Sequence, residues 1–204
     1  MKQHVQTKNR FGALFRSEGL EIPKGEQAYS SYEICFRLNS PSRKEIAMRL
    51  QEQCLELSSA KEKYLEKFKA VSQHFPEIST LRVIPGIDYV RALTIASIIG
   101  EPNRFENKHH YWSYCGLVNH KQLSGGNNYG YKKSRGRKEL KELYLGAIEN
   151  CLLHESNEFR KLYDRHRSRG LDHKAAKKAA ARKMASVTLN LLKTGNKYDK
   201  KLIF

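Results

Sequence analysis

The feature that most constrains the fold is an unbroken helical pattern that runs from Ser40 to Phe75. Ser40 supplies a capping hydroxyl, and a proline follows it where no amide donor is needed, so we expect the helix to begin there. Large side chains then recur at alternating spacings of four and three residues, at Leu50, Cys54, Leu57, Lys61, Tyr64, Phe68, Val71 and Phe75. Such a heptad seam favours pairing with a second helix, and a helix folded back on its own domain is the alternative.

The segments on either side of this helix also predict mostly helices. Residues 1–20 predict a short helix with apolar positions at Val5, Phe11, Leu14 and Phe15, and residues 32–38 predict a strand. We therefore expect a mainly α fold in which a long coiled-coil-like helix precedes a compact helical domain with a helix-hairpin-helix. The expected boundaries are 1–40 for a linker, 41–76 for the heptad helix and 77–204 for the helical domain.

Residues 79–100 predict two short helices joined by a tight turn at Pro85-Gly86-Ile87. In a helix-hairpin-helix, the turn amides and the second helix N-terminus face a DNA phosphate, so Gly86 is a candidate DNA contact. Asp88 stands where a second glycine is usual, and its charge would weaken phosphate capture. A purely structural helical hairpin fits these residues equally well.

Positive charge is concentrated in the second half of the chain. The net charge of +17 divides into +4 for the first hundred residues (15 basic, 11 acidic) and +13 for the remainder (23 basic, 10 acidic). A basic domain attracts nucleic acid through the release of counterions. We therefore favour a nucleic-acid partner over a merely solvated lysine-rich surface, and over an anionic membrane surface.

The stretch 118–136 combines glycines, cations and tyrosines. Glycine permits close approach to a phosphodiester backbone, although a mobile surface loop has the same composition. The candidate contacts in and just after this stretch are Lys121, Gly125, Gly126, Lys132, Lys133, Arg135, Arg137 and Lys138. The last predicted helix, capped by Asp172, adds Lys174, Lys178 and Arg182 on a face opposite its apolar stripe.

Several protein classes are disfavoured by what the sequence contains. No apolar run approaches the ~20 residues that span a bilayer, and no charged-then-apolar leader opens the chain, so we expect a cytoplasmic protein without membrane contact. The four cysteines form no C-x-x-C pair, which indicates reduced thiols. His109, His110, Cys115 and His120 lie close together, but their spacing matches no zinc template.

Three motifs in order then resemble one known family. They are IPGIDYVRALTIASIIGEPNRFENKHHYWSYCGL from residue 84, the Ser124-Gly125-Gly126 triplet, and KKSRGRKELKELYLGAI from residue 132. The set is similar to the C-terminal transposase domain of a bacterial insertion-sequence family that includes RuvC-like DEDD transposases, bridge-RNA-guided recombinases and Piv-type DNA invertases. The resemblance covers residues 79 to about 195, and the preceding helix is similar to the family's linker.

The resemblance implies a division of catalytic labour. An acidic RuvC-like domain holds magnesium, and a serine of the C-terminal domain attacks the phosphodiester; the matching position here is Ser124. Ser134 is a rival by its place in the loop but matches a non-catalytic family position. The chain departs from the family's usual Asn and Arg with Arg137 and Lys141, and Lys cannot bind phosphate with two parallel hydrogen bonds as Arg does.

No set of carboxylates in this chain can be assigned to a metal pair, since the first hundred residues contain a single aspartate. We therefore expect no cofactor here, with Mg²⁺ on a separate RuvC-like partner, and no strand cleavage by this chain alone. The expected partners are DNA, a guide RNA as an open alternative, and a second copy through the long helix. The rival hypothesis is a non-catalytic nucleic-acid-binding remnant of a transposase, and a general RNA binder is a weaker third reading.

Overall fold

A computed structural model describes residues 2–23, 25–133, 135–154 and 156–204. The chain is mainly helical, as predicted, and it divides into two compact units, residues 1–67 and 68–204. The division falls inside the longest helix. The elements of the first unit, together with that helix, are α1 (Lys2–Arg16), η1 (Glu26–Tyr29), η2 (Tyr32–Arg37) and α2 (Pro41–Ser72).

The first unit has a small core of its own, to which residues 1–40 contribute most of the large side chains. Phe11 and Phe15 are fully buried on one face of α1, whereas Val5 is exposed, so the prediction of Val5 as an apolar contact position was wrong. The strand predicted at residues 32–38 was also wrong, because this segment forms the short helix η2. The Gln51 side chain of α2 accepts a bond from the Cys35 thiol (3.1 Å), which holds η2 against the long helix.

The earlier and later parts of the heptad seam of α2 differ in burial. Cys54 is buried in the core of the first unit and Leu50 packs against it, so this part of the seam folds back on its own domain. Tyr64 and Val71, further along the helix, are exposed. Pairing of this later part with a second chain stays a prediction. The helix ends at Ser72, three residues before the predicted end at Phe75, and Pro76 begins the next helix.

The second unit is a helical domain built around its last long helix. Its elements are α3 (Pro76–Arg82), α4 (Tyr89–Ile99), η3 (Pro102–Arg104), α5 (Lys108–Tyr114), β1 (Asn119–Ser124), β2 (Asn127–Lys133), α6 (Lys138–Leu152), α7 (Glu158–Ser168), α8 (His173–Thr194) and η4 (Lys200–Ile203). Helices α3, α5, α6 and α7 all pack on α8. The Asp172 carboxylate caps α8, and its predicted apolar stripe is buried: Ala176, Ala180, Met184, Val187 and Leu191.

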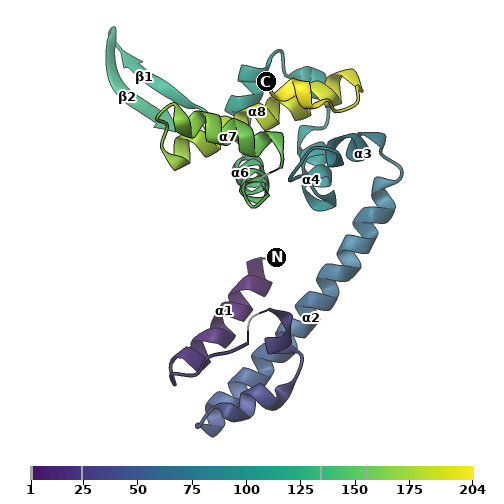
Figure 1. The fold of residues 1–204 in the computed structure, drawn as a ribbon, viewed down its shortest axis with the longest axis vertical. Coiled ribbons are helices and arrows are strands. Elements are labelled where there is room, and N and C mark those ends of the chain that lie inside the picture. Colours follow the sequence, from purple (N-terminus) through teal and green to yellow (C-terminus); the bar gives the residue numbers. More distant parts are fainter. Residues whose placement is uncertain (1, 24, 134, 155) are drawn as a thin grey trace. The chain divides into compact units, whose positions relative to one another are not determined.

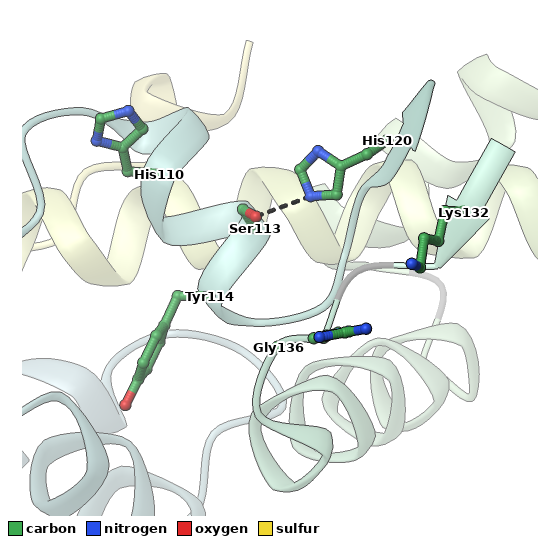
Figure 2. Close-up of a pocket in the computed structure, with 7 residues that line it drawn as sticks. His110, Ser113, Tyr114, His120, Lys132 and Gly136 are labelled. Atoms are coloured by element: carbon green, nitrogen blue, oxygen red, sulfur yellow. Dashed lines mark hydrogen bonds between the residues drawn. The ribbon is translucent and has the colours of Figure 1, made fainter. Parts of the chain in front are cut away.

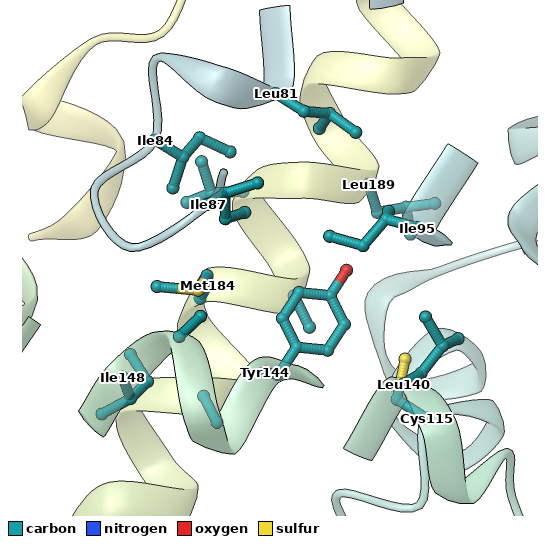
Figure 3. Close-up of a cluster of buried hydrophobic side chains, with 14 of the residues drawn as sticks. Leu81, Ile84, Ile87, Ile95, Cys115, Leu140, Tyr144, Ile148, Met184 and Leu189 are labelled. Atoms are coloured by element: carbon teal, nitrogen blue, oxygen red, sulfur yellow. The ribbon is translucent and has the colours of Figure 1, made fainter. Parts of the chain in front are cut away.

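A chain of hydroxyl groups crosses the core of the second unit. The Tyr144 hydroxyl lies 2.6 Å from that of Tyr111 and 2.7 Å from that of Thr188, which donates to the Ala185 carbonyl. Figure 3 shows Tyr144 in the middle of the apolar cluster. Each of these three hydroxyls has a partner, so burying them costs little desolvation, and their hydrogen bonds link α5, α6 and α8 at defined positions.

Helices α3 and α4 form the predicted helical pair, but its turn faces the protein. Gly86 has a φ of +83°, and a Cβ there would collide with the Ala147 carbonyl and the Cys151 sulfur of α6. The Asp88 carboxylate accepts from the Arg91 amide (2.8 Å) and so occupies the N-terminus of α4. The structure thus gives Gly86 a packing role, and a carboxylate fills the place expected for a phosphate.

The stretch 118–136, treated as a loop from its composition, contains an antiparallel β-hairpin. Ser124 pairs with Asn127 across a turn formed by Gly125 (φ +54°) and Gly126 (φ +81°), dihedrals that suit glycine and match the twist of a hairpin. Figure 1 shows the hairpin extending from the helical body beside α7 and α8. All of β1 is exposed, so apolar burial does not hold it in place.

Candidate nucleic-acid interface

The position of Ser124 follows from the hairpin geometry. It is the last residue of β1, immediately before the two-glycine turn, and its side chain is exposed. Nothing bulky stands beside the turn, since a Cβ added at Gly125 or Gly126 would meet no atom within 4 Å. A long ligand can therefore reach the Ser124 hydroxyl from outside the protein.

The two faces of the hairpin carry different side chains. Side chains alternate along a strand, so His120 and Ser124 share one face of β1, and Asn119 and Lys121 share the other. His120 pairs with Lys132, and Lys121 pairs with Tyr131. The register irregularity between Lys121 and Leu123 places its extra residue in β2, which leaves the alternation of β1 intact.

One face of the hairpin base adjoins the basic face of α8. A cavity of about 340 Å³ lies between them, lined by Asn119 and Tyr131 on the hairpin side and by Lys178 and Arg182 on the helix side. The Lys178 ammonium donates to the Asn119 side-chain oxygen (3.1 Å). Residues that are far apart in the sequence thus meet at one surface, including Lys178 and Arg182, both predicted as nucleic-acid contacts.

These cations repel one another. Burial, with Lys141 and Arg182 nearby, lowers the pKa of Lys178. Burial also lowers the pKa of Arg182, whose guanidinium lies over the Trp112 ring. Among the described residues no carboxylate forms an ion pair with Lys141, Lys178 or Arg182. Positive charge held together without a counter-charge is a site for a polyanion.

These cations also affect His166, which the sequence did not indicate as a binding residue. Burial and the nearby Arg169, Arg182 and Arg165 all lower the pKa of His166. A bound anion would offset these charges and favour the protonated imidazole.

The other face of the hairpin base borders a larger cavity of about 630 Å³. Figure 2 shows its walls: His110, Ser113 and Tyr114 come from α5, His120 and Lys132 from the hairpin, and Gly136 from the segment that leads into α6. The Ser113 hydroxyl and the His120 ring nitrogen Nε2 are 3.0 Å apart. This hydrogen bond ties the hairpin to α5.

Two arginines lie around the tyrosine of this cavity. Partial burial opposes ionisation of Tyr114, but hydrogen bonds from Arg104 and Arg137 outweigh it and lower its pKa. The Arg104 guanidinium also lies 4.7 Å from the centre of the Tyr114 ring. The predicted contact Arg137 is thus held at the N-cap of α6 by a phenol, and its backbone amide donates to the Tyr114 carbonyl (2.7 Å).

A close crossing of two backbone segments supports the hairpin. At Gly136 a Cβ would collide with the Gly116 amide and with the Ser113 and Tyr114 carbonyls. Only glycine fits there, because the chain returning from the hairpin passes directly over the end of α5. The sequence marks Gly136 only as one glycine of a glycine-rich stretch, so its anchoring role was missed.

The remaining predicted contacts are Lys174, Lys138, Arg135 and Lys133. Lys174, Lys138 and Arg135 are exposed, and Lys138 pairs with Glu142 (3.6 Å). Lys133 is the last residue of β2, and its side chain, like the whole of Ser134, lies outside the described residues. Sequence reasoning missed His110, Ser113 and His120 as neighbours of the cations, because only the meeting of α5 with the hairpin reveals them.

The cysteines and the metal-ligating side chains are the other groups with chemistry of their own. The four thiols are free and buried. Burial raises the pKa of Cys115 to about 12 and that of Cys151 to about 11, and a thiol in that state is a poor nucleophile. Among the described residues no three His, Cys, Asp or Glu side chains are arranged to hold a metal ion. The described helices also include none that combines the length and apolar character of a membrane span.

The sequence is similar to two sets of known proteins over regions that include part of this surface. Residues 78–164, which include α5, the hairpin and α6 but not α8, match the sequence model of the Transposase IS116/IS110/IS902 family. The chain is also similar to the transposase for insertion sequence element IS1111A of Coxiella burnetii (strain RSA 493 / Nine Mile phase I), with 25% identity over 165 residues. That match covers 77% of this chain and 45% of the relative, so the chain spans less than half the length of that protein. The chain is thus similar to transposases of this family over the matched residues.

Proposed function

We propose that this chain is the DNA-binding and strand-joining part of a transposase or site-specific recombinase, with Ser124 as the nucleophile. The observation that carries the proposal is the place of Ser124: an exposed hydroxyl at the tip of a hairpin whose base lies beside uncompensated cations. A hydroxyl that attacks DNA needs access to the backbone and positive charge around the reacting phosphate.

The proposed step conserves the energy of the DNA backbone. The Ser124 Oγ bonds to phosphorus, the phosphorus–oxygen bond to one DNA hydroxyl breaks, and the serine proton ends on that departing oxygen. The product is a phosphoserine ester and a free DNA hydroxyl. Attack by a hydroxyl of a second strand reverses these changes, rejoins DNA and releases the serine, so no external energy source is required.

The cations of this surface would position the strand. Lys121 and Tyr131 share one hairpin face, and Lys178 and Arg182 stand beneath it on α8. Contacts of Lys and Arg with phosphates supply affinity without reading sequence. Choice of the target would then come from another component, for which a guide RNA is one proposal.

The described part of the chain holds no group of three His, Cys, Asp or Glu side chains arranged to bind a metal ion. We propose that a RuvC-like domain outside these 204 residues provides the Mg²⁺ site. Assembly of copies through the exposed part of the α2 seam, which includes Tyr64 and Val71, is a further part of the proposal. Both elements follow from the resemblance and await their own tests.

The decisive experiment adds a RuvC-like domain in trans and looks for a covalent protein–DNA adduct. The unaltered chain with the added domain and Mg²⁺ should form an adduct, and Ser124→Ala should abolish it while DNA binding is retained. Ser168→Ala is the matched control, because Ser168 is an exposed serine on α7 whose hydroxyl donates to its own helix. This control should form adduct at the unaltered rate.

The outcomes separate two functions. An adduct that survives Ser124→Ala would refute the assigned nucleophile. DNA binding without any adduct would favour a non-catalytic binding protein, which the uncompensated charge of α8 also supports. Strand cleavage by the 204 residues with Mg²⁺ alone would refute the assignment of the metal site to another domain.

A further inference from the structure

The cavity beside α5 has the chemistry of an anion site. Its walls bring together hydroxyl, imidazole and cationic groups, and carry no carboxylate among the residues that line it. Lys132 lies opposite His120 in the hairpin, so both side chains emerge on the same face. Ser113 completes this wall through its hydrogen bond to His120. Such donors are the groups that bind phosphate oxygens in proteins.

The charges around the cavity are mostly positive. Arg135 lines the cavity directly. Arg104 and Arg137 form hydrogen bonds with Tyr114, which is also a lining residue. Two acids are close to these residues: the exposed Glu106 carboxylate lies 3.5 Å from His110 Nδ1, and Glu139 lies near Arg137 in the first turn of α6. The cations around the cavity outnumber these two acids.

The shape of the site also suits a phosphate with an attached nucleoside. Its volume of about 630 Å³ falls within the range of small-molecule sites, and it is larger than one phosphate requires. Gly136 forms part of the floor and leads directly into the first turn of α6, whose N-cap residue Arg137 makes no side-chain cap. The N-terminus of this helix thus adds its dipole to the charged side chains already present.

We propose that this cavity binds one backbone phosphate of the nucleic-acid strand on which Ser124 acts, at a position away from the reacting phosphodiester. His120, Ser113, Lys132 and Arg135 are the binding residues. The site rests on the proposed function in one respect, namely that the ligand is a nucleic-acid strand. It specifies how that strand is held.

The hairpin geometry sets the separation between the two phosphates. His120 and Ser124 lie on one face of β1, four residues apart, which corresponds to roughly 13 Å at ~3.3 Å per residue. The anchored phosphate would therefore lie only a few nucleotides from the reacting one on the same strand, close enough to fix the register of the strand.

The experiment titrates the full 204-residue chain with a 5′-phosphorylated thymidine dinucleotide and follows backbone amide signals by NMR. We expect the largest shifts at Ser113, His120 and Gly136. Inorganic phosphate should shift the same signals at higher concentration, which identifies phosphate as the recognised group. A dinucleotide with a hydroxyl end and a neutral methylphosphonate linkage should bind about tenfold more weakly or not at all.

Matched variants test the assignment of the cavity. His120→Gln and Lys132→Ala should each weaken dinucleotide binding by about fivefold or more. His109→Gln and Lys161→Ala are the controls, because His109 packs on Trp112 outside the cavity lining and Lys161 is an exposed position on α7. These should bind as the unaltered chain does. Equal losses in the controls, or shifts in the unaltered chain confined to other regions, would overturn the proposal even if a cavity variant fails to fold.

This result can be told apart from the fate of the proposed function. Ser124→Ala should leave dinucleotide binding unchanged, since its hydroxyl lies outside the cavity. Adduct formation without cavity binding would refute the phosphate site alone. Cavity binding without any adduct would refute the nucleophile and leave the phosphate site in a binding protein.

Discussion

The core of the second unit and its β-hairpin both contain large apolar side chains, but only those of the core are buried. Ile148, Tyr144 and Met184 are fully buried against one another, and the loss of contact with water accounts for their presence. Leu123, Tyr129 and Tyr131 are large and apolar too, but each is about two-thirds exposed. Packing within the protein does not explain these hairpin side chains, which are accessible to another molecule.

The largest effect should come from emptying the core. Ile148→Ala removes a fully buried side chain, and it should lower the free energy of unfolding by about 2–5 kcal/mol in urea denaturation. Leu123→Ala on the hairpin should change it by less than about 0.5 kcal/mol. A similar loss in both variants would mean that the hairpin packs against the domain in solution and would break the comparison.

A smaller effect is expected where the hairpin joins the helical body. Gly136→Ala forces a methyl group against the end of α5, and it should lower the free energy of unfolding by about 1–3 kcal/mol. The control is Gly125→Asn at the hairpin turn, where no atom lies within 4 Å and asparagine tolerates a positive φ. Thermal unfolding of both variants measures the difference, and equal melting temperatures would contradict the close crossing.

On the surface, the cations should matter for binding more than for folding. Lys178→Gln removes a charge that lies among other cations, so stability should stay equal or rise slightly. Its affinity for DNA should fall, and the slope of log K against log salt should decrease by about 1. Lys161→Gln, an exposed position on α7, serves as the control and should keep the original slope. A lower stability of Lys178→Gln would mean that its hydrogen bond to Asn119 contributes more than the relief of charge repulsion.

The smallest effect concerns pH. The pKa of His166 is lower in the folded chain than in the unfolded one, so the unfolded chain binds more protons below the ordinary histidine value. Its contribution to stability is therefore full above that value and is lost as pH falls through the folded pKa. Chemical denaturation at pH 5.5 to 7.5 should show a smaller decline for His166→Gln than for the unaltered chain.

Nucleic acid should weaken this pH dependence, because bound phosphates offset the arginines that depress the His166 pKa. Repeating the denaturation series with a saturating short duplex measures the change. An unaltered decline with the duplex present would place the bound phosphates away from Arg165, Arg169 and Arg182.

Much of the fold could be predicted from local patterns, because caps and apolar spacing act within one element. Asp172 caps α8 and Gly195 ends it with a positive φ, both as the sequence indicates. The segment 32–38 was misjudged because its fate depends on a distant residue: Gln51, on the long helix, accepts the Cys35 thiol and holds a short helix there. Val5 was misjudged for a related reason: the first apolar side chain of α1 that belongs to the core of the first unit is Phe11.

By itself, the sequence determined a mainly helical chain, a concentration of positive charge in its second half, and a serine beside two glycines in a basic stretch. Only the tertiary structure decided what those charges adjoin. It placed Lys178 and Arg182 under one face of the hairpin, and Ser113 and His120 on the other. The reason is physical: secondary structure follows from neighbours along the chain, whereas a binding surface depends on segments that packing brings together from distant positions.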